Sequence, residues 1–125
     1  MSLAHPAIAE IMVKAGFDWV AVDLEHSVIT VREAEELIRI IDLGGSVPLV
    51  RLSANDSVQI KRMMDAGARG VIVPMANSKE DVEKAVAAVH YPRKGTRGVG
   101  LARAQGYGAT FRKNLDWLKK EVVII

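Results

Sequence analysis

The stretch Phe17-Asp18-Trp19-Val20-Ala21-Val22-Asp23-Leu24-Glu25-His26 contains the pattern that decides the fold. Its run of Val and Ala, without strict polar alternation, predicts a β-strand over residues 17–24 that is buried on both faces, as in a parallel sheet. A helix is predicted on each side of this strand. The first covers residues 6–15 and ends at Gly16, and the second runs to about Leu43 from the capping box Thr30-Val31-Arg32-Glu33.

The same alternation continues along the chain. It predicts further strands over residues 47–52, 70–74 and 121–125, and further helices over residues 57–66, 78–89 and 111–120. The glycine-rich segment from Tyr91 to about Thr110 is predicted to be a loop. Strands that alternate with helices at this spacing form right-handed units with parallel strands, so the predicted fold class is α/β.

Two architectures fit such units, a doubly wound sheet and a (β/α)₈ barrel. No G-x-G-x-x-G motif follows a strand, because Gly95–Gly100 lies in the loop after a helix, and no phosphate-binding loop of the Walker type is present. Four strands and about four helices are roughly half of a TIM barrel of about 250 residues. Residues 1–125 are therefore expected to form a partial barrel domain that lacks the first strand and the C-terminal half.

Composition narrows the class of protein. The 125 residues include no cysteine, which excludes a disulfide scaffold and a cysteine-ligated zinc site, and the net charge of +2 is too even for a dedicated nucleic-acid binder. No apolar run could span a membrane and no signal peptide is recognisable, so we expect a cytoplasmic protein. The late basic residues permit two interpretations, a solvated surface or a pocket for anionic substrate groups; they are Arg93, Lys94, Arg97, Arg103, Arg112 and Lys113.

Polar residues follow the predicted strands at their carboxyl ends, where parallel α/β folds place active sites. Asp23, Glu25 and His26 follow the first strand, Arg51 closes the second, and Pro74 follows the third. The sequence therefore predicts that these residues converge at one end of the sheet.

The segment Asp23–His26 brings two carboxylates and an imidazole together within one turn. His26 is the natural general base, since the pKa of a histidine is ordinarily near 6.5. Glu25 could ligate a metal ion or a metal-bound water, and Asp23 could orient its neighbours. The alternative is a strand-end turn with solvated acids and a capping histidine.

Arg51 closes a buried apolar strand, a position that packing explains poorly. Its planar guanidinium could bind a substrate carboxylate through two parallel hydrogen bonds. The alternative is an ion pair with Asp23, Asp56 or Glu25. Both tryptophans, Trp19 and Trp117, are predicted to lie in the core.

Five segments together resemble the HpcH/HpaI aldolase family, whose members are metal-dependent class II pyruvate aldolases on a (β/α)₈ barrel. The segments appear in the family's order and cover nearly the whole chain. They are Ala15–His26, Pro48–Leu52, Gln59–Ala68, Val73–Met75 and Tyr91–Gly100.

The resemblance implies a role for several residues. His26 matches a catalytic histidine that works through a metal-bound water, and Asp65 matches a carboxylate that pairs with such a histidine, in some members across a subunit interface. Arg51 matches the arginine that binds the pyruvate end of the substrate and stabilises the enolate. The remaining matches are Glu25 in contact with the water shell of the metal, Asp23 in support of the site, and Pro74 and Arg97 in substrate-binding segments.

The same resemblance implies a divalent cofactor, Mg²⁺ or Mn²⁺, whose direct ligands are expected beyond residue 125. It also implies a pyruvate-type 2-oxo acid as substrate. Because an open half-barrel leaves two bare strand edges and a wide apolar face, we expect self-association into a homo-oligomer. Two alternatives stay open. One is a non-catalytic half-barrel that self-associates and binds at most a small carboxylate at Arg51, and the other is a related lyase that acts on acyl-CoA esters.

Overall fold

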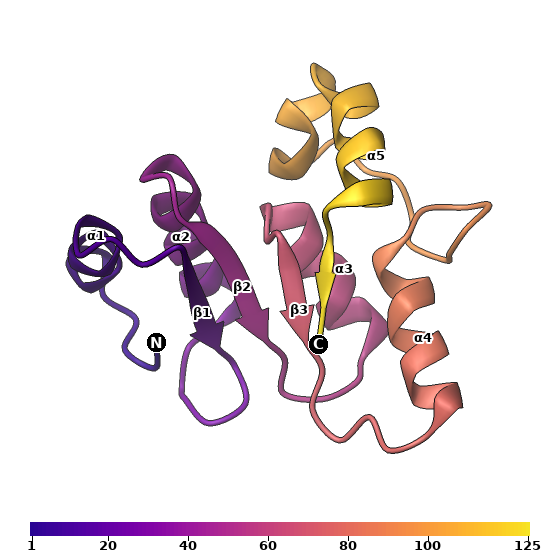
Figure 1. The fold of residues 1–125 in the computed structure, drawn as a ribbon, viewed down its shortest axis with the longest axis horizontal. Helices are drawn as coiled ribbons and strands as arrows, with labels where there is room; N and C mark the ends of the chain where they lie inside the picture. Colours follow the sequence, from indigo (N-terminus) through magenta and orange to yellow (C-terminus); the bar gives the residue numbers. More distant parts are fainter.

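The computed structural model describes residues 1–125 as alternating strands and helices (Figure 1). Each predicted strand and helix is present, and the boundaries agree to within a few residues. The predicted loop also holds a 3₁₀ segment. The elements are α1 (Pro6–Lys14), β1 (Trp19–Asp23), α2 (Val31–Leu43), β2 (Val47–Arg51), α3 (Ser57–Ala66), β3 (Gly70–Ile72), α4 (Lys79–Val89), η1 (Arg103–Gly108), α5 (Phe111–Lys120) and β4 (Val123–Ile124).

The four strands form one parallel sheet in the order β1-β2-β3-β4, which confirms the predicted α/β class. In the register of β1 and β2, Asp23 lies opposite Arg51. The carboxyl ends of both strands therefore bring these two residues together, 28 positions apart in sequence.

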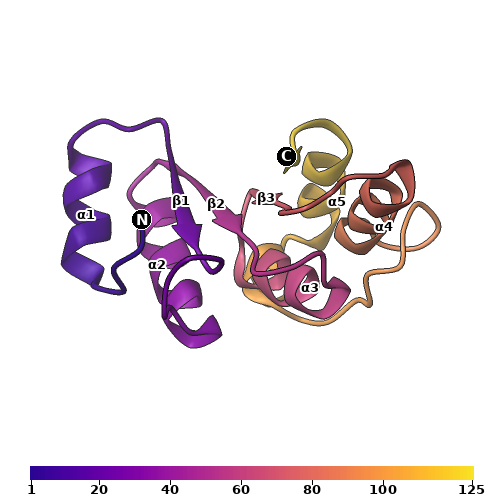
Figure 2. The ribbon, with the colours of Figure 1, turned by 90° about the horizontal axis from the view of Figure 1, so that it is seen from below.

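Helices α2 and α3 pack against one face of the sheet and enclose the core (Figure 2). The predicted capping box is present at the start of α2, where Thr30 and Glu33 each accept a backbone N–H. Gly67 ends α3 with a φ of 104°, a left-handed conformation that favours glycine. None of the helices combines the length and the apolar character that crossing a bilayer requires.

The opposite face of the sheet has no helix over it and carries exposed apolar side chains. Trp19 is 56% exposed, and Val47 beside it is exposed as well. The prediction that Trp19 lies in the core is wrong, because side chains alternate along a strand and Val20 and Val22 take the core-facing positions. Trp117, in contrast, is partly buried against the core.

The first residue of the chain lies along the outer edge of β1. The amino group of Met1 donates to the carbonyl of Ala21 at 2.8 Å, and the N–H of Asp23 donates to the carbonyl of Met1 at 3.0 Å. Part of this sheet edge is therefore already hydrogen-bonded.

Candidate active site

Asp23 organises the carboxyl end of the sheet. Its Oδ1 accepts hydrogen bonds from Nε of Arg51 at 2.9 Å and from the backbone N–H groups of Glu25 and His26 at 3.0 and 3.2 Å. Its Oδ2 accepts from Nη2 of Arg51 at 2.7 Å. The carboxylate thus binds the guanidinium through two parallel bonds and also fixes the turn that carries Glu25 and His26.

This pairing determines the charge states of both partners. The hydrogen bonds from Arg51 hold the pKa of Asp23 well below its usual range, so Asp23 is ionised and does not exchange protons near neutral pH. The same contact raises the pKa of Arg51. The ion-pair interpretation of Arg51 is therefore correct for this chain, although its side chain stays 38% exposed and its Nη1 makes no hydrogen bond within the chain.

His26 and Glu25 extend this pair toward solvent. Nε2 of His26 lies 3.5 Å from Oε1 of Glu25, and Oε2 of Glu25 lies 3.4 Å from Nε of Arg51. The His26 side chain is 71% exposed, so its imidazole is open to a ligand. The strand ends therefore bring together a titratable base, a carboxylate and a guanidinium in one contiguous chain of side chains.

Ser27 supports this site, although the sequence patterns did not single it out. Its hydroxyl donates to the carbonyl of Asp23 and accepts the N–H of Ile29. A serine soon after a strand end, where a side-chain turn can form, is the signal that could have found it. The result is a turn held at both ends, which limits the movement of His26.

Asp65 and Arg97 lie elsewhere, in the helix layer. Nη1 of Arg97 is 3.7 Å from Oδ1 of Asp65, and the guanidinium stacks over the ring of Tyr91 at 4.0 Å. Burial raises the pKa of Asp65 and lowers that of Arg97. Within the chain, no hydrogen bond or ion pair joins Asp65 to His26. The ion-pair partner of His26 is Glu25, and that of Asp65 is Arg97.

The donor set at the strand ends is small for a metal site. No three acidic or histidine side chains in the chain are grouped closely enough to hold an ion. Asp23 uses both oxygens on Arg51, whereas Glu25 is only weakly engaged. Glu25 is therefore the one acid here with an oxygen available to a cation, and one carboxylate does not complete a divalent metal site.

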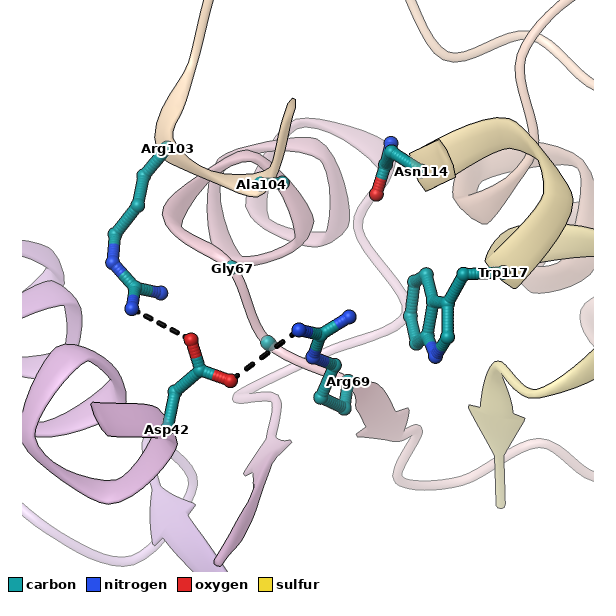
Figure 3. Close-up of a pocket in the computed structure, with 8 residues that line it drawn as sticks. Asp42, Gly67, Arg69, Arg103, Ala104, Asn114 and Trp117 are labelled. Carbon is teal, nitrogen blue, oxygen red and sulfur yellow. Dashed lines mark hydrogen bonds and ion pairs between the residues drawn. The ribbon is translucent and has the colours of Figure 1, made fainter. Parts of the chain in front are cut away.

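A second ionic cluster lies at the amino ends of the strands, beside a cavity of about 100 Å³ (Figure 3). Asp42 of α2 accepts from Nη2 of Arg103 at 2.6 Å and from Nη2 of Arg69 at 3.4 Å. Arg69 also stacks over Trp117, with its guanidinium carbon 4.9 Å from the ring centroid. This cluster, here called the amino-end cluster, ties α2, η1, α5 and the start of β3 together.

The late basic residues divide between the two interpretations that the sequence left open. Arg97 and Arg103 are drawn into contacts with acids, and neither lies at the carboxyl ends of the strands. The other four side chains are exposed, as a solvated surface requires; they are Arg93, Lys94, Arg112 and Lys113. The six residues therefore form no common pocket.

Comparison with known sequences gives a consistent result. The sequence model described as HpcH/HpaI aldolase/citrate lyase matches residues 1–125. A 2-dehydro-3,6-dideoxy-6-sulfogluconate aldolase from Pseudomonas putida is 42% identical over 106 residues, which cover 84% of this chain and 42% of that protein. A hydroxypyruvate/pyruvate aldolase from Roseobacter denitrificans is 40% identical over 110 residues, 86% of this chain and 43% of that protein.

Solved structures agree with the sequences. An HpcH/HpaI aldolase/citrate lyase family protein from Burkholderia cenocepacia superimposes with a TM-score of 0.89 at 31% identity, over 99% of this chain and 51% of that one. An HpcH/HpaI aldolase from Desulfitobacterium hafniense gives 0.84 at 29% identity, over 98% of this chain and 48% of that one. The chain thus spans about half the length of the proteins that it matches.

Proposed function

Because the chain belongs to the HpcH/HpaI aldolase/citrate lyase family, we propose that the protein is a carbon–carbon lyase that cleaves 4-hydroxy-2-oxo acids to pyruvate and an aldehyde. The observation that carries the proposal is the contiguous arrangement of His26, Glu25 and Arg51 at the carboxyl ends of parallel strands. Relatives named as aldolases support the reaction class. Since the chain spans about half of their length, the activity is proposed for the whole protein.

Cleavage requires a base and a site for negative charge. His26 accepts the proton of the substrate C4 hydroxyl, directly or through one water, and the C3–C4 bond then breaks. The electron pair of that bond moves into the enolate of pyruvate, and C3 later takes up a proton. Arg51 faces the substrate with its free Nη1 edge, where it binds the carboxylate and stabilises the enolate charge. Pro74, after β3, contributes to the wall of the substrate site.

Asp23 is a positioning residue in this scheme. It fixes Arg51 through two hydrogen bonds and the backbone of His26 through a third. Because it is ionised and fully paired, it holds the base and the guanidinium in place without exchanging protons itself.

The proposal includes a divalent cation, Mg²⁺ or Mn²⁺, which would polarise the keto group when bound. Glu25 is the only water-mediated candidate among residues 1–125, and it does not complete a metal site. The proposed cation therefore needs direct ligands from outside these residues, and no step of the scheme is assigned to it.

Asp65 is proposed to pair with His26 of a second subunit, as the family resemblance implies. Its position on α3 within the helix layer, without contact to His26 of its own chain, is compatible with this pairing. Arg97 matches a substrate-binding segment of the family, but its guanidinium lies against Asp65 and Tyr91 and not at the strand ends, so no contact with the substrate at His26 and Arg51 is proposed for it.

Pyruvate release from a 4-hydroxy-2-oxo acid tests the proposal, measured for the 125-residue chain and the whole protein with and without Mn²⁺. We expect metal-stimulated turnover by the whole protein. His26→Ala and Arg51→Ala should each lower it by about a hundredfold or more. His5→Ala removes an exposed histidine that precedes α1 as its N-cap, away from the strand ends, and should leave the rate unchanged. A whole protein without turnover, or one that is indifferent to His26→Ala, would contradict the assignment.

A second function is favoured by the open sheet face and the incomplete metal site. In this alternative, residues 1–125 alone form a half-barrel without activity that self-associates and binds at most a small carboxylate at Arg51. A chain that is inactive and sediments as an oligomer, beside an active whole protein, would support it. Turnover by the chain itself, lost in His26→Ala, would exclude it.

A further inference from the structure

Arg97 is a buried cation whose hydrogen-bonding groups lack partners. Its side chain is 1% exposed, yet Nε and Nη1 donate to no acceptor in the chain. The nearest carboxylate oxygen, Oδ1 of Asp65, is 3.7 Å away and also has no hydrogen-bond partner. Buried polar groups are nearly always hydrogen-bonded in native proteins, so a further acceptor is expected beside Arg97.

A cavity of about 280 Å³ adjoins this guanidinium, between α3 and the loop that follows α4. No acidic residue lines it. Its lining includes Lys61, Thr96 and Gly98, together with Ser57 and Val58 from the first turn of α3. The backbone N–H groups of a first helical turn have no partner within the helix, and the helix dipole makes this end positive.

The charges around the cavity are unequal. Ser57, Lys61 and Asp65 recur at intervals of four residues and share one face of α3. Burial raises the pKa of Asp65, and the charges of Arg97 and Lys61 partly oppose this effect. Both cations therefore interact with this one carboxylate. Asp56, the N-cap of α3, accepts the N–H of Gln59 and does not line the cavity. The cavity lining itself therefore holds two cations, Lys61 and Arg97, and no acid.

We propose that this cavity, here called the α3 cavity, binds a small oxyanion of the phosphate or carboxylate class. Arg97 and Lys61 would supply charge, and the N–H groups of Ser57 and Val58 would supply directed hydrogen bonds, as at other anion sites on helix N-termini. The site lies in the helix layer, apart from His26 and Arg51, and it does not depend on the proposed aldolase activity.

The test is a ¹H–¹⁵N NMR titration of the 125-residue chain with sodium phosphate, sodium acetate or sodium chloride at equal ionic strength. We expect phosphate or acetate to cause saturable shifts at the amides of Ser57, Val58 and Gly98 at millimolar concentrations, and chloride to cause none. Tighter binding of phosphate than of acetate identifies a phosphoryl ligand, and tighter binding of acetate identifies a carboxylate. Shifts that do not saturate, or that centre on Arg51, would overturn the proposal.

Lys61→Ala separates the site from general charge effects, because Lys61 is exposed and its loss should leave the fold intact. We expect anion affinity to fall about fivefold or more. Lys14→Ala, which removes an exposed lysine paired with Glu10 on α1, is the matched control and should not change it. Equal losses in both variants would contradict the assignment. Arg97→Gln should abolish binding if it folds, and the Lys61 result decides the matter if it does not.

Discussion

Arginine–carboxylate ion pairs form at both ends of the sheet, but the ratio of carboxylates to guanidinium groups is reversed between them. At the carboxyl ends, two carboxylates, Asp23 and Glu25, share the guanidinium of Arg51. At the amino ends, two guanidinium groups, Arg69 and Arg103, share one carboxylate, Asp42 (Figure 3). In the first cluster only Glu25 keeps a weakly engaged carboxylate oxygen, and in the second the two guanidinium groups offer more N–H donors than Asp42 can accept.

The surroundings of the two clusters differ as well. The carboxyl-end cluster continues into His26, which is 71% exposed, and it borders the uncovered face of the sheet. The amino-end cluster is covered by η1, α5 and the Trp117 ring, and Nη1 of Arg103 donates to the last turn of α3 at the Ala66 carbonyl. One arrangement leaves groups free for a ligand, and the other joins secondary structure elements. The ion pairs at both ends hold parts of the chain together, but only the carboxyl-end cluster also keeps exposed groups, the His26 imidazole and part of the Arg51 guanidinium.

Asp23→Ala should produce the largest loss of stability. It leaves the guanidinium of Arg51 and two backbone N–H groups without their acceptor, and we expect the free energy of unfolding to fall by about 3 kcal/mol. Urea denaturation measures this. Glu25→Gln removes only the more distant partner and should cost about 0.5 kcal/mol. Equal costs for the two variants would mean that Asp23 is not the organising residue.

Acid should weaken the carboxyl-end pair by a comparable amount. The pKa of Asp23 is lower in the folded chain than the unfolded value of about 3.9, so its contribution is complete above about pH 4 and is lost as the pH falls through the lower folded value. We expect about 2 kcal/mol of pH-dependent stability to disappear between pH 4 and pH 2. Asp23→Asn should flatten this limb of the curve. An unchanged limb in the variant would assign acid sensitivity to other groups.

Asp42→Ala tests the amino-end cluster. Both arginines lose their carboxylate, but Arg103 keeps the Ala66 carbonyl and Arg69 keeps the Trp117 ring. We therefore expect the free energy of unfolding to fall by about 1.5 kcal/mol, less than for Asp23→Ala. Turnover of the folded whole protein should not change. Asp116→Ala, at an exposed ion pair with Lys119, should cost about 0.3 kcal/mol in the same urea experiment. A cost for Asp42→Ala as small as this control would remove the stabilising role.

Substitution of the two tryptophans should affect the free energy of unfolding very differently, and Trp19 should give the smallest effect of all. Trp19→Ser on the uncovered face should change the free energy of unfolding of the 125-residue chain by about 0.5 kcal/mol or less. Trp117→Ser, which removes a partly buried ring beside Arg69, should cost about 2 kcal/mol. Thermal unfolding of both variants provides the measurement. A large loss for Trp19→Ser would indicate that this face is covered in solution, as by self-association.

The sequence was sufficient for the order and type of the secondary structure elements. The Val and Ala run before Asp23, the capping box at Thr30 and the stop at Gly67 each act within a few residues, so local periodicity and capping chemistry predict them. The gathering of Asp23, Glu25, His26 and Arg51 at one edge also follows from the sequence, since parallel strands end on the same side of a sheet.

Only the tertiary structure decided how these charges are distributed. From the sequence, Asp23, Asp56 and Glu25 were all possible ion-pair partners of Arg51. The register of β1 against β2 places Asp23 opposite Arg51, with Glu25 as a second, more distant partner. The burial of Arg97 beside Asp65, the exposure of Trp19 and the meeting of Arg103 with Asp42 were likewise not predictable. These contacts join residues distant in sequence through the packing of strands and helices, and such geometry leaves no periodic signal in the chain.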